Sequence, residues 1–340
     1  MVNRAIFLGA SAGGVEALKD VIRELPEKLP APVFVVLHIP PYISSALPKI
    51  LAEAGHLPAI HPKNGASIRP GVIYVASPDH HLLTEKDHVL VKKGPKENLF
   101  RPSIDALFRS GAYTYRNRAI GVVLSGVLDD GTSGLWSIKR LGGTAIVQEP
   151  NEARFETMPR SALEYVEVDY TLTAPEIGKL LGTLVNETVR SSGMNHSQSE
   201  DKKRMATEIG VASEDDAFNK GVLELGELTP FTCPECHGVL VRVAEGKMSR
   251  FRCHTGHAYT DSALIEAVME FSGELLWQVI RSLEEGVLLL EHMAKHLEKA
   301  GSSSRAAIFR SKSLEIKKRS EAYHKDVLIH ESLSGDNLGQ

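Results

Sequence analysis

The stretch AIFLGASAGGVEAL, residues 5–18, decides the fold of the first half of the chain. An apolar run ends in a glycine-rich turn, and a helical pattern of apolar residues follows it. Continuous apolar runs are typical of strands buried on both faces of a parallel sheet. The stretch therefore predicts the first strand, turn and helix of an α/β fold. The turn itself is open to two interpretations, a phosphate-binding loop or a turn that presents Ser11 as a nucleophile.

The phosphate interpretation fits this turn poorly. A dinucleotide-binding turn reads G-x-G-x-x-G, and an acidic residue closes the next strand. Here Ser11 stands at the middle glycine, and the next apolar run, VFVVLHIP, reaches His38 instead of an acid. No Gly-Lys-Ser/Thr of a P-loop follows either. The turn matches G-x-S-x-G, in which Gly9 and Gly13 allow a sharp turn that exposes the serine hydroxyl.

A serine hydroxyl becomes a good nucleophile only with a base within hydrogen-bond distance. His38 ends the second predicted strand, and Asp129 and Asp130 follow the apolar run over 120–126. Because ligands of open parallel sheets bind at the carboxyl ends of the strands, we expect serine, histidine and aspartate to meet there. Such a set is typical of base-assisted acyl transfer. Three residues of a separate segment compete for the base and orienting roles: His80, His81 and Asp79.

The rest of residues 1–186 alternates between strand and helix patterns, which predicts a doubly wound, mainly parallel α/β sheet with flanking helices. Strands are expected over 5–9, 33–38, 73–76, 120–125 and 144–147, and helices over 14–24, 46–54, 103–110 and 132–141. Residues 71–93 differ, because two strand-like runs joined by a polar turn indicate an antiparallel insertion. Ser103 is the expected N-cap of its helix, and Asp105 is expected to complement that helix dipole.

Bulk properties exclude several classes of protein. The 340 residues carry a net charge of −4, which gives no reason to expect nucleic acid or an anionic membrane as a partner. No apolar run is long enough to span a bilayer, so no membrane insertion is expected. The N-terminal apolar run passes straight into the glycine turn, unlike a signal peptide. We therefore expect a cytoplasmic protein.

The C-terminal part differs in composition. Residues 187–221 are polar without an apolar period and are predicted to be a linker. The three cysteines follow: Cys233 and Cys236 in a Cys-x-x-Cys, then Cys253 with His257 four residues on. This spacing predicts a zinc-ribbon-like module over 222–260 with a structural Zn²⁺, since four ligands leave no open position for catalysis. His257 is the favoured fourth ligand over the alternatives His254 and His237.

Residues 261–333 show apolar residues at helical spacing on both sides of a GSSS break. This pattern predicts a hairpin of two long helices. An apolar stripe of this kind belongs to a core, or to a seam with a second copy or another partner. We expect the hairpin to self-associate or to dock a partner.

Six blocks in the first half of the chain together resemble the catalytic domain of chemotaxis protein-glutamate methylesterases of the CheB type. They read IFLGASAGGVEAL, VVLHIPP, GVIYVASPDHHLL, RPSIDALFRSGA, GVVLSGVLDDGTSGLWSIKRLGGTAIVQEP and MPRSALE. The resemblance implies a Ser-His-Asp hydrolase without a catalytic cofactor. Its partners would be the cytoplasmic domains of methylated chemoreceptors, which it demethylates at glutamate and often deamidates at glutamine. It further implies Ser11 as nucleophile, His38 as base and Asp130 as the orienting acid.

The sequence departs from the family pattern near these residues. Many members have Thr where this chain has Ala12, which with Gly13 would supply oxyanion N–H groups. The family's Gly-Met-Gly reads Gly126-Val127-Leu128 here, so Val127 takes the place of a residue lining the substrate groove. Arg101, Pro102 and Ser103 match a family block and are interpreted as the start of a helix.

Two further hypotheses remain open at this point. The sequence starts one strand before Ser11, which predicts that the receiver domain common in this family, and its control of the active site, are absent. One alternative is a scaffold protein that acts through its C-terminal region and carries a vestigial esterase domain. The predicted absence of the receiver domain and the change at Val127 favour it. A hydrolase with the same mechanism and another acyl substrate is the other.

Overall fold

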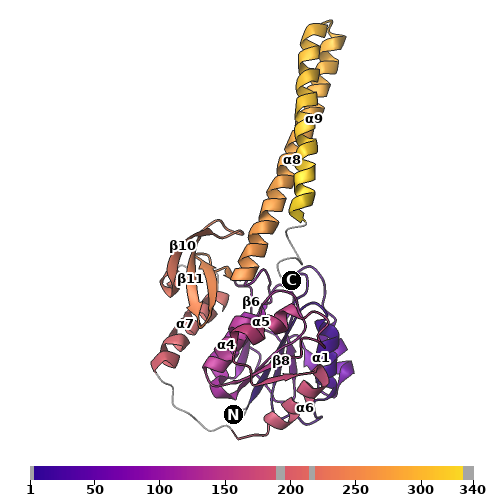
Figure 1. Ribbon diagram of the computed structural model, residues 1–340. Coiled ribbons are helices and arrows are strands. Elements are labelled where there is room, and N and C mark those ends of the chain that lie inside the picture. The colour runs from indigo at the N-terminus through magenta and orange to yellow at the C-terminus, as the bar shows by residue number, and fades with distance from the viewer. Residues whose placement is uncertain (1–3, 189–195, 214–218, 332–340) are drawn as a thin grey trace. The chain divides into compact units, whose positions relative to one another are not determined.

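The computed structural model of the protein describes residues 4–188, 196–213 and 219–331 (Figure 1). The chain divides into two units, Met1–Leu264 and Ile265–Gln340, and each is treated by itself below. The first unit holds the α/β sheet and the cysteine-containing segment. The second holds most of the long C-terminal helices.

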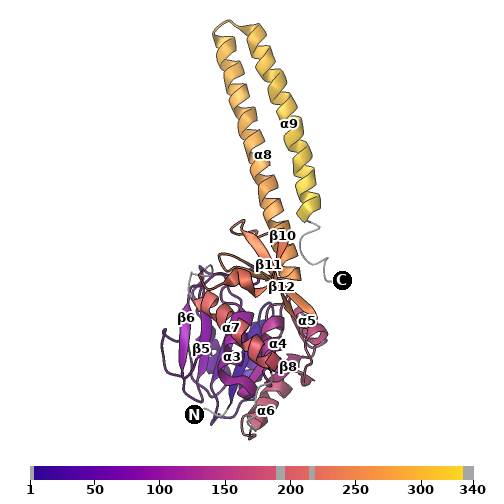
Figure 2. The ribbon, with the colours of Figure 1, turned by 90° about the vertical axis from the view of Figure 1, so that its left-hand side faces the viewer.

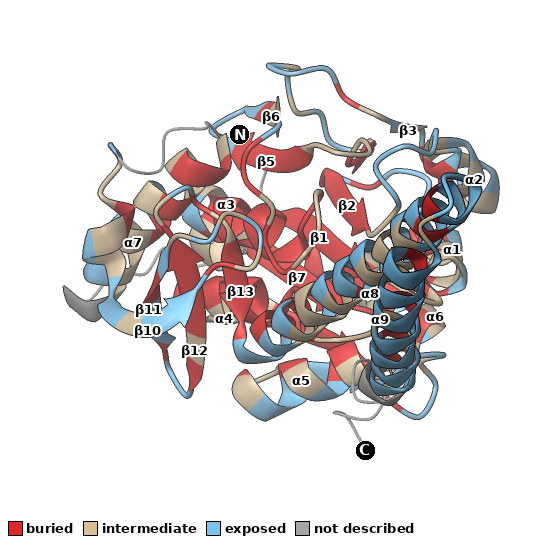
Figure 3. Ribbon diagram, turned by 90° about the horizontal axis from the view of Figure 1, so that it is seen from above, coloured by how far each residue is buried: buried red, intermediate tan, exposed pale blue. Residues whose placement is uncertain are grey.

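The centre of the first unit is a seven-stranded sheet in the order β3-β4-β2-β1-β7-β8-β9. Every neighbouring pair in it is parallel. Its strands are β1 (Ala5–Ala10), β2 (Val33–Leu37), β3 (Ala59–Ile60), β4 (Ile73–Val75), β7 (Ala119–Val123), β8 (Thr144–Gln148) and β9 (Tyr170–Leu172). The three central strands are buried along their whole length, as their continuous apolar sequences require (Figure 3).

Helices cover both faces of this sheet and form two separate cores. One core contains residues of α1 (Gly14–Arg23), α2 (Leu47–Ala54) and α6 (Ala174–Leu184). The other contains residues of α3 (Ile104–Tyr115), α4 (Thr132–Arg140) and α5 (Thr157–Tyr165). The prediction of a doubly wound, mainly parallel α/β fold is therefore confirmed.

The antiparallel insertion is also confirmed, because β5 (His81–Glu85) and β6 (His88–Lys92) form a two-stranded antiparallel sheet. Two edge strands of the main sheet, β3 and β9, were not predicted. They contain only two and three residues, too few to show a period of hydropathy.

The prediction of a linker over 187–221 is wrong for its middle part, which forms helix α7 (His196–Ser213). This helix packs on α3 and on the β5–β6 hairpin (Figure 2). Its buried residues are Met205, Glu208, Val211 and Ala212. Since a glutamate stands at the centre of the buried face, the segment has no clear apolar period. Residues 189–195 and 214–218 of the predicted linker lie outside the described residues.

The Cys-rich module, defined here as residues 219–264, follows α7. Four strands form an antiparallel sheet in the order β10-β11-β12-β13. They are β10 (Glu227–Thr232), β11 (Val239–Glu245), β12 (Met248–Cys253) and β13 (Ala258–Thr260), preceded by a short 3₁₀ turn, Val222–Leu225. This agrees with the ribbon-like module expected over 222–260.

Helix α8 (Asp261–Lys299) begins in the first unit, and α9 (Ser303–Glu331) lies in the second. Within the second unit the two helices are joined by an ion pair from Arg310 to Glu298 and by a hydrogen bond between His324 and Glu284, as predicted for a hairpin. Large apolar side chains stay exposed on it, among them Leu288, Leu289 and Leu328. No helix in the described ranges has the length and hydropathy to cross a lipid bilayer.

Candidate functional site

Ser11 lies in the turn between β1 and α1. Its N–H donates to the carbonyl of Ser125 at 2.9 Å, which ties the turn to the segment that follows the neighbouring strand β7. Gly13 has φ 71°, a conformation that favours glycine, and it is the N-cap of α1. A Cβ at Gly126 would stand only 2.9 Å from the Cβ of Ser11, so this glycine leaves the space that the serine occupies. The sequence motif thus folds as a sharp strand-to-helix turn.

His38 follows β2 and lies between the other two predicted site residues. Its Nδ1 is 3.1 Å from Ser11 Oγ, and its Nε2 is 2.8 Å from Asp130 Oδ2. The side chains of His38 and Asp130 are only 3% and 2% exposed. Phe100 stacks on the imidazole with ring centroids 3.8 Å apart. The imidazole that serves Ser11 as an acceptor carries its proton on Nε2, where Asp130 accepts it.

Asp130 is fixed by several donors besides His38. Its Oδ1 accepts from the Asn98 amide at 2.8 Å, the Ser103 hydroxyl at 3.0 Å and the Asp105 N–H at 3.2 Å. Its Oδ2 accepts from the N–H of Ile104 at 2.7 Å. Burial alone would raise the pKa of Asp130, but the hydrogen bond from His38 and these donors hold it below the usual range. The carboxylate therefore sits ionised at the N-terminus of α3.

Asp105 lies in the first turn of α3 as predicted, and its side chain also bonds a second helix. Its buried carboxylate accepts from the N–H groups of Gly131 and Gly134, at the start of α4. The two aspartates therefore each bond the N-terminus of the other's helix. Asp130, which precedes α4, accepts from N–H groups at the start of α3, and Asp105 of α3 accepts from N–H groups at the start of α4. Burial and then the charge of Asp130 raise the pKa of Asp105. Ser103 caps α3 as expected, its hydroxyl accepting from Ala106 at 3.4 Å.

The competing residues of the inserted segment have other bonds. His81 is buried, with Nε2 donating to the carbonyl of Pro95 and Nδ1 accepting from the N–H of Ser103. Nδ1 of His80 lies 2.9 Å from the carbonyl of Pro78. Asp79 pairs with Arg101. The structure brings none of the three to Ser11 in any described contact.

The chain matches known proteins over this same region. A model of the family described as CheB methylesterase matches residues 6–181, slightly more than half of the chain. The chain belongs to the CheB methylesterase family.

Two relatives and one solved structure show how far the family likeness extends. A Leptospira interrogans protein, provisionally named a protein-glutamate methylesterase/protein-glutamine glutaminase, is 39% identical over 53% of this chain and 94% of its own length. A Thermotoga maritima protein with those two names is 33% identical over 54% of each chain, so only about half of that relative is matched. The crystal structure of the Thermotoga maritima CheB methylesterase catalytic domain is 31% identical, with a TM-score of 0.53 over 54% of this chain and 100% of that one.

The three residues expected to shape the family's oxyanion and substrate groove lie around Ser11. Ala12 and Gly13 are half-buried and form the turn directly before α1. The Ala12 carbonyl accepts from the Ser125 hydroxyl at 2.8 Å. Val127 is half-buried and follows Gly126, which abuts Ser11. The next residue, Leu128, has φ 63°, a backbone conformation that favours glycine.

Asp129, the neighbour of Asp130, faces the Cys-rich module. Its Oδ1 accepts from the hydroxyl of Thr260 at 2.7 Å. Burial raises the pKa of Asp129 to about 6, although the bonds from Thr260 and Ser262 act the other way. One aspartate of the pair therefore belongs to the Ser11–His38 chain and the other to the contact with the module.

The four predicted metal ligands come together in the module. The ligand atoms of Cys233, Cys236, Cys253 and His257 all lie within 4.8 Å of one another. Cys236 and Cys253 have their sulfurs 3.6 Å apart, close to the roughly 3.8 Å edge of a tetrahedral zinc–thiolate site. His257 faces the thiols with Nδ1, while its Nε2 is 3.4 Å from the Glu235 carboxylate. A carboxylate behind a ligating imidazole is common around zinc, so the residues fit this metal.

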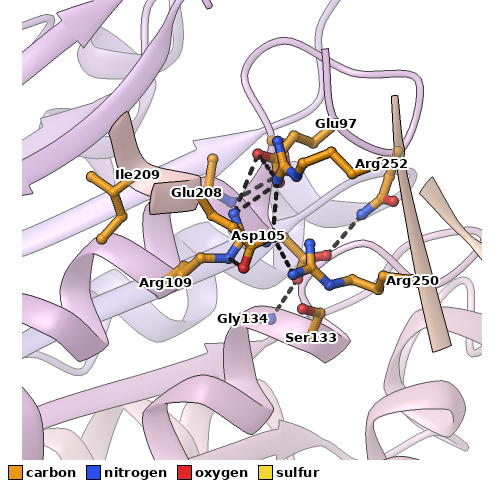
Figure 4. Close-up of polar contacts among 12 residues, drawn as sticks. Glu97, Asp105, Arg109, Ser133, Gly134, Glu208, Ile209, Arg250 and Arg252 are labelled. Carbon is orange, nitrogen blue, oxygen red and sulfur yellow. Dashed lines mark hydrogen bonds and ion pairs between the residues drawn. The ribbon is translucent and has the colours of Figure 1, made fainter. Parts of the chain in front are cut away.

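A buried cluster of charges joins the module and α7 to the α/β part of the unit (Figure 4). Arg252 of β12 donates to Glu97 at 2.7 Å and to Glu208 of α7 at 3.1 Å. Arg109 of α3 pairs with Glu97 at 3.0 Å, and Arg250 of β12 pairs with Glu208 at 2.5 Å. Burial would raise the pKa of Glu97, but Arg109 and then Arg252 lower it to about 2. Glu97 is therefore ionised at neutral pH, buried between two arginine side chains.

Sequence reasoning missed Asn98, Phe100 and Glu208. Asn98 and Phe100 lie in a loop without periodicity, and no motif marks the residue that bonds Asp130. Glu208 lies within a segment whose polar composition resembles that of an unfolded linker. A spacing pattern finds ligands that are close in sequence, whereas these residues reach the site through tertiary contacts alone.

Proposed function

We propose that the protein is a serine hydrolase that removes methyl esters from glutamate side chains of methyl-accepting chemoreceptors. The observation that carries the proposal is the continuous chain of hydrogen bonds from Ser11 through His38 to Asp130. Membership of the CheB methylesterase family and the names of the relatives support the choice of substrate. No cofactor takes part in this chemistry.

Acylation begins at Ser11. His38 Nδ1 takes the hydroxyl proton while Oγ attacks the ester carbonyl, and the proton passes to the departing methanol. Asp130 holds the Nε2 proton of the imidazole and stabilises the imidazolium that forms. Phe100, stacked on His38, restricts the ring to the plane in which both hydrogen bonds are made. Water then cleaves the acyl-enzyme with the same base.

The oxyanion of the tetrahedral intermediate would lie at the start of α1. The N–H groups of Ala12 and Gly13 precede the helix and are its nearest donors in sequence to Ser11. Val127 would border the substrate on the β7 side, beside Gly126. A glutamine side chain presents the same carbonyl with ammonia as leaving group, so deamidation requires no additional residue in this scheme.

The remaining parts of the chain have proposed roles of their own. Residues 1–186 form the catalytic domain, 222–260 a zinc-ribbon-like module and 261–333 a helical hairpin that self-associates or docks a partner. The partners are the cytoplasmic domains of methylated chemoreceptors, which places the protein in the cytoplasm. Cys233, Cys236, Cys253 and His257 would hold one structural Zn²⁺. Metal analysis of the purified protein tests this, and less than about half a zinc per chain contradicts it.

Methanol release from a methylated chemoreceptor fragment tests the function directly. We expect release by the full-length protein and none above background by Ser11→Ala, because the nucleophile is removed. A fluorophosphonate probe separates substrate from mechanism, since it labels an activated serine whatever the natural substrate. Labelling without methanol release would indicate another acyl substrate. Neither labelling nor release would contradict the hydrolase and favour a scaffold protein.

A further inference from the structure

Asn98 connects the site to the Cys-rich module. Its Nδ2 donates to Oδ1 of Asp130 and to Oδ2 of Asp105, each at 2.8 Å. Its Oδ1 accepts from the N–H of Thr260 at 3.0 Å, and its own N–H donates to the Ala258 carbonyl at 2.8 Å. The residue is 3% exposed. The side-chain oxygen and the main-chain N–H of Asn98 therefore both bond β13, while its side-chain nitrogen bonds two carboxyl groups, one in the first turn of α3 and one just before α4.

The orientation of this amide matters for Asp130. Turned the other way, the Asn98 carbonyl would face the ionised Asp130 and lose that hydrogen bond. The N–H of Thr260 fixes the orientation, because it offers a donor only to the oxygen of Asn98. A hydrogen bond to a charged group is stronger than one between neutral groups, and its loss in a buried place leaves the charge without a compensating donor.

The module also holds the loop that carries Asn98. Arg252 pairs with Glu97 at 2.7 Å, and the Ala258 N–H donates to the Lys96 carbonyl at 3.2 Å. Asn98 and Leu99 have φ 51° and 72°, strained conformations that persist only where the surroundings impose them. The same loop delivers Phe100 to the face of His38. Contacts with β12 and β13 therefore keep two residues of the site in place.

We propose that the Cys-rich module completes the catalytic centre, with β13 orienting Asn98 and Asn98 acting as a positioning residue for Asp130. This proposal rests on the proposed function of the Ser11–His38–Asp130 chain. Asn98 is buried behind Asp130 and contacts no substrate, so its loss lowers turnover without weakening substrate binding. The module thus works as part of the enzyme and not as an appendage to it.

Variants of the full-length chain test this on each side of the contact. Asn98→Gly removes the amide while glycine tolerates the positive φ, and we expect kcat to fall about tenfold with KM within about twofold. Arg252→Gln loosens the loop from the module side, and we expect a fall of several-fold in kcat. Arg242→Gln is the matched control, since Arg242 pairs with Glu227 on the exposed side of the same module. It should leave kcat unchanged.

The combination of variants shows the route. If the module acts through Asn98, Arg252→Gln reduces kcat little further in the Asn98→Gly background. If the fold-reductions in kcat of the two single variants multiply in the double variant, the proposal is overturned. It is also overturned if Asn98→Gly leaves kcat unchanged or changes only KM. Should Arg252→Gln fail to fold, Asn98→Gly decides alone.

Hydrogen exchange gives a readout that does not depend on activity. Amides of residues 94–101 should exchange faster in Arg252→Gln than in Arg242→Gln, while those of β1 keep their protection. Equal exchange of the loop in the two variants would overturn the proposal whatever the activity. A different outcome would overturn the proposed function alone. The wild-type protein would then show no Ser11-dependent turnover, while residues 94–101 would still exchange faster in Arg252→Gln. In that case the coupling between module and loop would stand.

Discussion

The edge of the sheet that carries Ser11, His38 and Asp130 differs from the Cys-rich module in what holds it together. The sheet has two extensive apolar cores, and its polar site is fixed by helix ends and backbone N–H groups. The module is a small sheet that leaves Leu228 and Phe231 72% and 51% exposed and buries Arg250 and Arg252 instead. A sheet of this size supplies only a small core of its own, so its stability depends on the buried charges and on its neighbour. The predictions below test each side of this contrast.

The largest effect is expected at the well-packed site. Asp130→Asn keeps the size of the side chain but removes the negative charge and replaces one acceptor oxygen by an amide donor, so no carboxylate holds the His38 proton on Nε2. By analogy with serine hydrolases in which the tautomer is lost, kcat should fall about 10⁴-fold. Kinetics on the methyl ester substrate measure this. A fall of less than about tenfold would mean that Asp130 does not orient His38.

The next effect concerns the buried charges that attach the module. Glu208→Gln leaves Arg109, Arg250 and Arg252 without a shared partner, and breaking such a buried cluster costs about 3–5 kcal/mol. Denaturant unfolding measures this free energy. Lys203→Gln, an exposed change on the same helix, is the matched control. If both variants unfold at the same denaturant concentration, the charges do not hold the module.

The same cluster predicts a response to acid. Glu97 has a pKa of about 2 in the folded protein against an ordinary 4.5, so its ionisation stabilises the fold above the ordinary value. That contribution is lost as pH falls from about 4.5 towards 2. Glu97→Gln should therefore lose stability relative to wild type at neutral pH and approach it in acid. If the difference in unfolding free energy between wild type and Glu97→Gln does not change with pH, the charge of Glu97 does not stabilise the contact.

Asp129 predicts the opposite sign and a smaller effect. Its pKa of about 6 in the folded protein lies above the ordinary 3.8, so the folded state binds more protons and stability falls as pH rises between these values. Asp129→Asn removes this cost and keeps an acceptor for Thr260. It should be more stable than wild type at pH 7 by at most about 3 kcal/mol, and not at pH 3. Melting curves across this range measure it, and a constant difference contradicts it.

The contrast also explains what the sequence could predict. The three predicted site residues, Ser11, His38 and Asp130, each follow the carboxyl end of a strand. Parallel topology brings these ends together at one edge of the sheet, so their proximity could be predicted without knowing the loop conformations. The four metal ligands have a spacing that chemistry restricts. Asn98 and Glu208 have neither signal, because their roles depend on how a loop and a polar helix pack against the module. Asp105 was placed correctly in its helix, but its partner at the start of α4 depends on the crossing of two helices.

Labelling of the full-length protein with a fluorophosphonate, followed by identification of the modified residue by mass spectrometry, tests the central claim most directly. We expect one adduct per chain, on Ser11, with its formation greatly slowed in His38→Ala and in Asp130→Asn. Labelling at another serine, or at Ser11 with equal rates in all three proteins, would contradict the account, because Ser11 would then not be activated through His38 and Asp130.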